Sequence, residues 1–131
     1  RNKKIVNDKR YIELQEIDRR EPVGEHVNTF TLVLIIATRP NEPGASDFVR
    51  HWLSWGAGPR AGQNMIMAAK ARALMQGRLY VTLEDVEAVA APVLRHRLVP
   101  NFNAEAEGIS VEQIVEKIIT LIPRGKGERL L

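Results

Sequence analysis

Apolar residues recur every three or four positions in several segments of this 131-residue chain, and that spacing places them on one face of an α-helix. Stretches rich in proline, glycine and charged residues separate these segments and interrupt helices. The pattern predicts helices within residues 8–18, 24–38, 46–55, 59–76, 83–93 and 111–122. We therefore expect an all-α fold, a small bundle of about five or six helices in which the apolar faces of the last two share one core.

The composition of the segment from residue 24 to residue 38 allows a second interpretation. Its β-branched residues, gathered in residues 29–36, would also suit a buried strand. A helix is the better prediction because Val27, Phe30 and Leu34 fall on one helical face, the segment is long, and no partner strand is evident nearby.

Residues that start and stop helices support these boundaries. Thr82 is a typical N-cap, and residues 110–113 form a capping box, in which Ser and Gln side chains accept hydrogen bonds from each other's backbone N–H groups. Gly77 predicts a helix stop, and Pro92 is expected to kink or shorten the helix that contains it. Residues 98–108 show no period, so we expect them to be irregular.

Residues 56–62 read Gly-Ala-Gly-Pro-Arg-Ala-Gly and lead into the longest predicted helix. Pro59 suits the first helical position, where its missing N–H would have no partner. A helix N-terminus carries unpaired N–H groups and a partial positive charge, to which Arg60 would add a full charge. Gly58, Pro59 and Arg60 are therefore candidates for binding an anion such as a phosphate. The alternative is a glycine-rich turn followed by a solvated arginine, and spacing alone does not decide between them.

The large side chains of two predicted helices suggest packing surfaces. Ser46 is a typical N-cap, and the helix after it would turn Phe48, Trp52 and Trp55 towards the body of the protein. We interpret the tryptophans as core or domain-interface residues rather than a platform for stacking bases. The small alanine side chains of residues 59–76 favour a helix that other helices can approach closely. Its methionines could form an adaptable binding surface, but core filling is the usual explanation, and we expect it here.

The composition is that of one domain with an aliphatic helical core, since 44% of residues are hydrophobic and only 5% aromatic. The absence of cysteine excludes disulfides and thiolate metal sites and suits a reducing, cytoplasmic location. The longest apolar run, residues 32–37, is far too short to cross a bilayer, so we expect a soluble protein without a membrane span. Because the chain begins with Arg1, we expect it to be a piece of a longer protein.

The net charge of +3 arises at one end of the chain. Residues 1–10 hold five basic residues and one acid, which leaves 14 basic and 15 acidic residues among the other 121. We expect residues 1–7 to be a flexible basic segment rather than a nucleic-acid-binding arm, and residues 124–131 to be a flexible tail. The folded domain should then span residues 8–123.

Motifs for catalysis are missing. No GxxxxGK[ST] phosphate loop is present, and no serine lies in a GxSxG turn. His26, His51 and His96 lack the spacing of metal ligands such as HExxH, so we predict no metal site. The chain alone is not expected to catalyse a reaction.

Three separated motifs nevertheless resemble, in order and spacing, the C-terminal lid of the MoxR family of AAA+ ATPases. The first is a run that reads Phe-Val-Arg at residues 48–50 and Ser-Trp-Gly-Ala-Gly-Pro-Arg-Ala at residues 54–61. The others are Ala-Ala-Lys-Ala-Arg-Ala-Leu at residues 68–74 and Pro-Val-Leu-Arg-His-Arg at residues 92–97. The resemblance covers roughly residues 8 to 122 and leaves the basic first ten residues without a counterpart. It explains the missing motifs, because in AAA+ proteins a separate α/β core carries the phosphate loop and the metal-binding acids.

The resemblance implies a function for the anion-binding candidates. In that family the arginine at the position of Arg60 is the sensor 2 residue, which contacts the γ-phosphate of ATP, in its own or in a neighbouring subunit. ATP and Mg²⁺ would be held mainly by the missing core, whose ATPase activity the lid would convert into domain motion. The family further implies a chaperone-like motor, a homo-oligomeric ring, usually a hexamer, and partners with von Willebrand factor A domains.

Two other classes of function stay open. A helical nucleic-acid-binding module would use residues 95–97, Arg-His-Arg, and the N-terminal lysines to contact phosphates, and its binding would depend steeply on salt. A protein-interaction module would dock the helix of residues 59–76 into a partner's groove.

Overall fold

A computed structural model describes residues 23–123, so the helix predicted within residues 8–18 and both predicted tails lie outside the described residues. The described part contains six helices and two short strands, which confirms the predicted all-α bundle. In chain order the elements are α3 (Glu25–Ala37), α4 (Asp47–Trp52), β1 (Leu53–Trp55), α5 (Ala61–Met75), α6 (Leu83–Leu94), β2 (Val99–Pro100), α7 (Phe102–Glu107) and α8 (Val111–Thr120).

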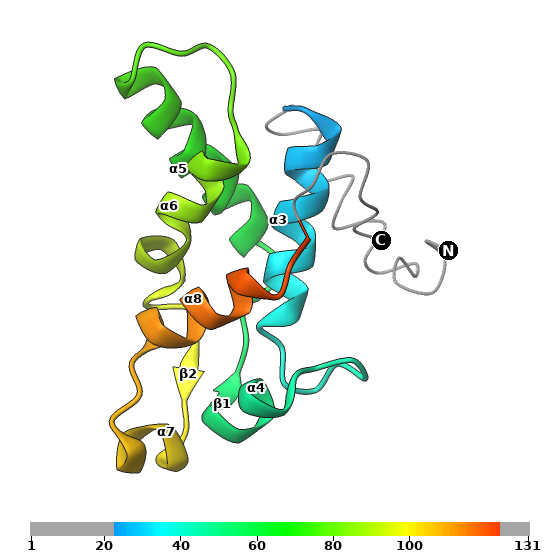
Figure 1. Ribbon diagram of the computed structural model, residues 1–131, viewed down its shortest axis with the longest axis vertical. Helices are drawn as coiled ribbons and strands as arrows, with labels where there is room; N and C mark the ends of the chain where they lie inside the picture. The colour runs from blue at the N-terminus through cyan, green and yellow to red at the C-terminus, as the bar shows by residue number, and fades with distance from the viewer. Residues whose placement is uncertain (1–22, 124–131) are drawn as a thin grey trace.

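Helices α5 and α6 form an antiparallel hairpin along one side of the molecule (Figure 1). Gly77 ends α5 with a left-handed conformation, φ 77°, as predicted. Around it the N–H of Arg78 donates to the Ala73 carbonyl at 2.9 Å and that of Gly77 to the Leu74 carbonyl at 2.9 Å. This pair of bonds is a Schellman motif, which satisfies the last carbonyls of α5 and turns the chain towards α6.

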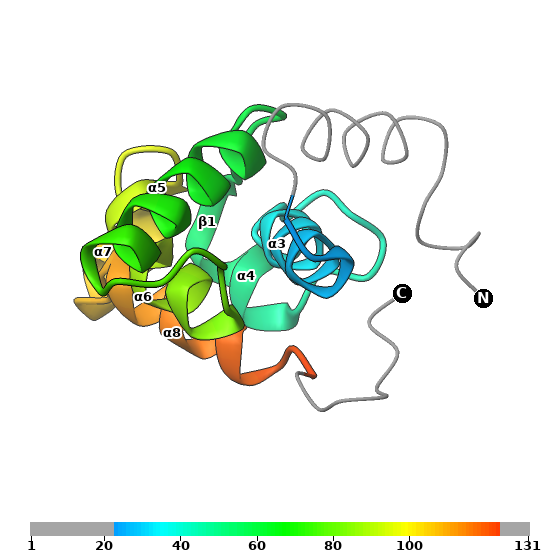
Figure 2. The same cartoon turned by 90° about the horizontal axis from the view of Figure 1, so that it is seen from above.

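The core lies where α3, the α5–α6 hairpin and α8 meet. Figure 2 shows α3 beside the hairpin, and α8 crosses below both in Figure 1. Apolar side chains from all four helices form one buried cluster, among them Phe30, Leu34, Met65, Ile66, Val86, Leu94, Ile114 and Ile118. The prediction that residues 83–93 and 111–122 share a core is confirmed, as is the helix predicted within residues 24–38.

The predicted helix caps are mostly confirmed. Thr82 and Asp85 form a reciprocal capping box at the start of α6, and Ser110 and Gln113 form the one at the start of α8. Ser46 is the N-cap of α4, but its side chain makes no capping hydrogen bond. Pro92 lies inside α6, which continues to Leu94 and is not shortened.

The prediction for residues 98–108 is wrong, because β2 and α7 both lie there. The helix predicted within residues 46–55 is also too long. The last three residues of that range form β1, which pairs antiparallel with β2. Asn101 starts α7 by accepting a hydrogen bond from the Ala104 N–H at 3.1 Å, and Gly108, at φ 70°, ends it. Strands of two and three residues are too short to show a periodic pattern of apolar residues. Their pairing also depends on contacts between residues far apart in the chain, which no local pattern reveals.

Candidate functional site

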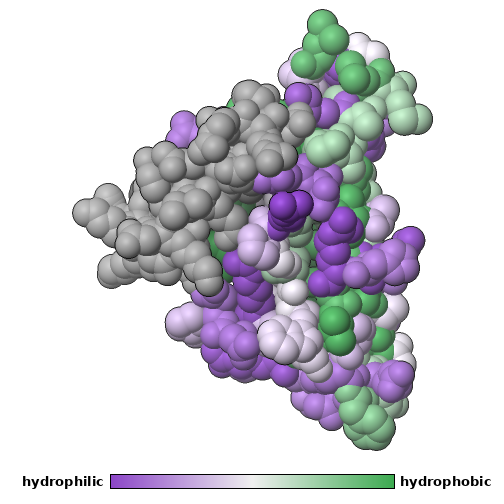
Figure 3. All heavy atoms as spheres, turned by 180° about the vertical axis from the view of Figure 1, so that it is seen from behind, coloured by the Kyte–Doolittle hydropathy of each residue, from purple (hydrophilic) through white to green (hydrophobic). Residues whose placement is uncertain are grey.

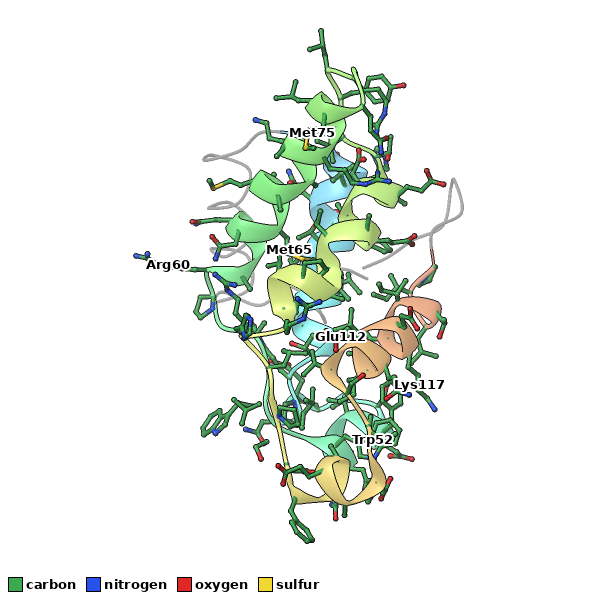
Figure 4. All side chains as sticks on the ribbon, turned by 90° about the vertical axis from the view of Figure 1, so that its left-hand side faces the viewer. Trp52, Arg60, Met65, Met75, Glu112 and Lys117 are labelled. Atoms are coloured by element: carbon green, nitrogen blue, oxygen red, sulfur yellow. The ribbon has the colours of Figure 1, made fainter. Side chains whose placement is uncertain are left out.

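Arg60 occupies the N-cap position of α5, and α5 itself begins at Ala61, two residues after the predicted Pro59. The N–H of Ala61 donates to the Gly58 carbonyl at 3.2 Å, and the N–H of Asn64 donates to the Arg60 carbonyl at 3.3 Å. Gly58, Pro59 and Arg60 are all exposed. The Arg60 side chain extends away from the body of the protein (Figure 4) and has no hydrogen-bond or ion-pair partner among the described residues.

The electrostatics of this helix start favour an anion. No side chain caps α5, and its first turn contains no acidic residue. Each of the other five helices in residues 23–123 has at least one acid in its first turn. An acid there compensates the positive end of the helix dipole, so α5 presents that end uncompensated and adds the charge of Arg60. The arrangement can bind a phosphate oxygen without displacing an existing ion pair.

The residues just before this site are held against the end of α3. A Cβ on Gly56 would lie 2.4 Å from the Thr38 carbonyl oxygen, so only glycine fits. Ala57 is 2% exposed; its N–H donates to the Thr38 hydroxyl at 2.9 Å and its carbonyl accepts from Arg39 Nε at 2.8 Å. A Cβ on Gly58, in contrast, would have no neighbour within 4 Å. The glycine-rich stretch therefore has an anchored half and an exposed half.

An ion-pair cluster joins α5 to α6, and the sequence patterns did not predict it. The fully buried Asp85 carboxylate accepts hydrogen bonds from Arg72 at 2.5 Å and from Arg78 at 2.7 Å. It also accepts from the Thr82 N–H at 2.8 Å as part of the capping box. The Arg78 hydrogen bond is the main reason that the pKa of Asp85 lies far below its ordinary value. The sequence identifies Thr82 as a helix start, but no spacing rule links Asp85 to the two arginines.

The two tryptophans differ in their environment. Trp52 is half-buried, with its ring 6.0 Å from that of Phe48 and its indole N–H donating to Glu107. The Lys117 ammonium lies 5.7 Å from the Trp52 ring centroid. The packing interpretation is confirmed for Trp52, but within the described residues Trp55 is 65% exposed, so its predicted inward orientation is wrong. Trp55 lies at the end of β1, where Ser54 before it and both residues of β2 are also exposed.

Most of the exposed large apolar residues of the α5–α6 hairpin lie at its tip, with Met67 in the middle of α5 as the exception. Leu74, Met75, Leu79 and Tyr80 are between 62% and 93% exposed, and Figure 3 shows this end of the molecule as a hydrophobic area. Met65 is buried in the core as expected, whereas Met67 and Met75 are 55% and 87% exposed, so the core-filling prediction is wrong for these two. Figure 4 places Arg60 and Met75 at opposite ends of α5.

The rival basic cluster at residues 95–97 is partly neutralised. Arg95 donates to Glu112 at 2.5 Å, and this bond is the main reason that the pKa of Glu112 is lowered. Arg97 donates to the Val93 carbonyl at 2.8 Å. The N-terminal lysines of this alternative lie outside the described residues.

Among residues 23–123, no three histidine or acidic side chains are grouped so that they could hold a metal ion. In the same range no helix has the length and apolar character needed to span a bilayer.

Comparisons with known proteins identify the family. A sequence model of the AAA lid domain matches residues 49–118, more than half of the chain, from α4 to α8 and including Arg60. The chain is 36% identical over 121 residues to "Chaperone MoxR1" of Mycobacterium tuberculosis, covering 92% of this chain and 32% of that protein. It is 37% identical over 70 residues to "Protein MoxR" of Paracoccus denitrificans, covering 52% of this chain and 20% of that protein.

A solved structure supports the same assignment. The crystal structure of a candidate ATPase from Cytophaga hutchinsonii matches with a TM-score of 0.72 and 36% identity, covering 85% of this chain and 34% of that one. The chain thus spans about a third or less of the length of these relatives. The resemblance seen in the motifs is confirmed: the chain belongs to the AAA lid domain family and is homologous to the MoxR proteins.

Proposed function

We propose that this chain is the C-terminal lid of a MoxR-type AAA+ ATPase and that Arg60 is its sensor 2 residue. The observation that carries the proposal is the exposed guanidinium of Arg60, without a partner among the described residues, at the acid-free start of α5. It lies within the part of the chain that matches the AAA lid family. A solvated surface arginine would need no such helix start.

Arg60 would act by contacting the γ-phosphate of ATP, because its planar guanidinium can donate two parallel hydrogen bonds to phosphate oxygens. Gly58 and Pro59 would bring the backbone near the phosphates, since both are exposed and a Cβ at Gly58 would have no neighbour. Arg60 would lose this contact after hydrolysis, so the ATP and ADP states would favour different lid positions. The chain itself would hold no metal, and a separate core would hold ATP and Mg²⁺.

The remaining parts of the proposal concern the whole protein. By homology with MoxR proteins, we propose a chaperone-like, cytoplasmic motor that assembles into a ring, with a hexamer as the expected form and von Willebrand factor A domain proteins as partners. In such a ring Arg60 would meet ATP bound either to its own subunit or to the neighbouring one. Mixed rings in which only some subunits carry Arg60→Ala would separate these arrangements.

The test of the Arg60 role is Arg60→Ala in the full-length protein, with ATP turnover and melting temperature measured together. We expect a clear loss of turnover, because dedicated arginine contacts in phosphoryl transfer are worth roughly 10³–10⁵ in rate and a sensor should retain part of that effect. Stability should change by less than about 1 kcal/mol, since an exposed arginine contributes little to folding.

Two further variants sharpen the test. Arg60→Lys keeps the charge and loses the planar fork, so it should recover only part of the activity. Arg50→Ala removes an exposed arginine on α4, whose guanidinium donates to the carbonyls of Glu42 and Pro43, and should keep normal turnover. Wild-type turnover in Arg60→Ala would return Arg60 to the role of a solvated charge.

A further inference from the structure

The hydroxyl of Thr38 joins the end of α3 to the segment that leads into α5. Thr38 is fully buried at the C-cap of α3, and its hydroxyl donates to the Ile35 carbonyl at 2.6 Å. The same oxygen accepts the hydrogen bond from the Ala57 N–H at 2.9 Å. A hydroxyl can donate one bond and accept others, so this single atom satisfies a helix-end carbonyl and fixes a distant peptide.

The contact allows little sliding. Arg39 Nε holds the carbonyl of Ala57 at 2.8 Å, so both polar groups that belong to Ala57 are bonded to consecutive residues of one helix end. Gly56 lies so close to the peptide that joins Thr38 and Arg39 that a Cβ on Gly56 would be 2.6 Å from Arg39 Cα. Closely packed backbones of this kind do not move by small amounts without breaking contacts.

This anchoring restricts where Arg60 lies. Only Gly58 and Pro59 separate Ala57 from Arg60, and the proline ring fixes its own φ angle. On the other side Ala61 is 2% exposed and belongs to the core. The backbone of Arg60 is thus bracketed by two buried alanines, whereas its side chain is exposed.

We propose that Thr38 is a positioning residue for Arg60. Its hydroxyl fixes Ala57 and thereby sets the place from which the Arg60 guanidinium reaches a phosphate. Thr38 cannot contact the nucleotide itself, because its side chain is fully buried. This inference rests on the proposed sensor role of Arg60 and adds the residue through which α3 controls it.

The test compares Thr38→Val with Thr38→Ser in the full-length protein. Valine keeps the shape and removes the hydroxyl, whereas serine keeps the hydroxyl. A displacement of about 1 Å in a reacting group can lower a rate by as much as ~10²-fold, so we expect Thr38→Val to reduce kcat by roughly 10- to 100-fold. Because a separate core would bind most of the ATP, KM should change much less than kcat. Thr38→Ser should recover most of the lost turnover.

A double variant distinguishes positioning from general destabilisation. If Thr38 acts through Arg60, adding Thr38→Val to Arg60→Ala should cause no further loss of kcat, since the contact it positions is already absent. A merely structural role predicts the same fold-loss in both backgrounds and would refute the inference. So would wild-type kcat in Thr38→Val, or failure of Thr38→Ser to restore turnover.

Different results would overturn the sensor role of Arg60 and the positioning role of Thr38. Normal turnover in Arg60→Ala overturns the sensor role and this inference with it. Impaired Arg60→Ala together with normal Thr38→Val overturns only the positioning role. Should Thr38→Val not fold, Arg39→Gln removes the second bond to Ala57 at a half-buried position, and the same lack of additivity with Arg60→Ala is expected.

Discussion

Gly56 and Gly58 lie two residues apart in the same stretch but have different reasons to be glycine. Gly56 touches backbone: its Cβ would lie 2.4 Å from the Thr38 carbonyl oxygen and 2.6 Å from the Thr38 carbonyl carbon. Gly58 has open space at the same position, and neither residue has a positive φ angle. The first glycine is needed for folding, whereas the second leaves room beside Arg60.

We predict that Gly56→Ala destabilises the protein and Gly58→Ala does not. Forcing an atom into backbone contact costs about 1–3 kcal/mol, because the end of α3 or the loop must shift. At Gly58 the change should stay within about 0.5 kcal/mol. Urea unfolding of both variants checks the difference, and equal midpoints for the two would contradict the close approach at Gly56.

Among residues 23–123, Asp85 is the one charged residue that is buried. Its carboxylate is fully buried between two guanidinium groups that are 33% and 22% exposed. Removing one side of a buried pair typically costs about 3–5 kcal/mol. The partners here can still reach water, so the loss should fall at or below the lower end of that range.

Asp85→Asn should therefore destabilise the protein by about 2–3 kcal/mol at neutral pH. The pKa of Asp85 is lowered by folding, chiefly by the Arg78 hydrogen bond, so its contribution is present above the unfolded-state pKa. That contribution is lost as the pH falls below the ordinary value of 3.8. Urea midpoints measured from neutral to acidic pH should fall steeply for the wild type and less for Asp85→Asn. Parallel curves would show that Asp85 is not the group responsible.

At the scale of elements, residues on the apolar face of α8 are buried in the core, whereas other apolar residues near its end are exposed. Ile118 is 1% exposed and packs in the core with α6, whereas Leu121, at the end of the same helix, is 57% exposed. Truncating a buried isoleucine to alanine costs about 2–5 kcal/mol through lost burial and the cavity left behind.

We predict that Ile118→Ala lowers the free energy of unfolding by about 2–5 kcal/mol. Leu121→Ala should change it by no more than about 0.5 kcal/mol. The two variants remove side chains of equal size, one from inside α8 and one from its C-cap, so the comparison shows the effect of burial. Chemical denaturation gives both values. Equal losses would mean that α8 does not pack as described.

Elements with local signals could be predicted from the sequence, and those defined by distant contacts could not. The stripe of α8 and its capping box repeat within one or two turns, so neighbouring residues reveal them. The β1–β2 ribbon pairs Trp55 with Val99, and no local pattern links positions so far apart. Helix α7 has only six residues, although its Asn101 cap and Gly108 stop were visible signals.

The candidate site follows the same division. Arg60 could be found because proline, glycine and arginine at a helix start form a local motif. The bond from Ala57 to Thr38 spans 19 residues and became visible only in the fold. Likewise Asp85 could be recognised as a cap residue, but its two arginines lie on another helix and on the connecting turn.

At the scale of the whole molecule, the lid presents two different ends. Arg60 stands at the start of α5 and the apolar tip of the hairpin at its end, about 20 Å away for a helix of this length. Helix α5, whose inner face packs in the core with α3 and α6, connects the two ends.

The last prediction concerns this chain in isolation: it should not bind Mg-ATP with micromolar affinity. A micromolar dissociation constant requires about 8 kcal/mol of binding free energy. Two charged hydrogen bonds from one arginine are worth about 1.5–3 kcal/mol each, and the helix dipole adds at most about 2 kcal/mol. The loss of translational and rotational freedom on binding costs about 4 kcal/mol or more, so these contacts fall short of the required free energy. The chain contains no phosphate loop to supply the rest.

Isothermal titration of Mg-ATP into the chain measures the affinity, after circular dichroism has shown that the chain is helical. The full-length protein serves as the positive control. Micromolar binding by the chain alone would show that the lid has a nucleotide site of its own, and Arg60 would then have to be reconsidered as part of that site.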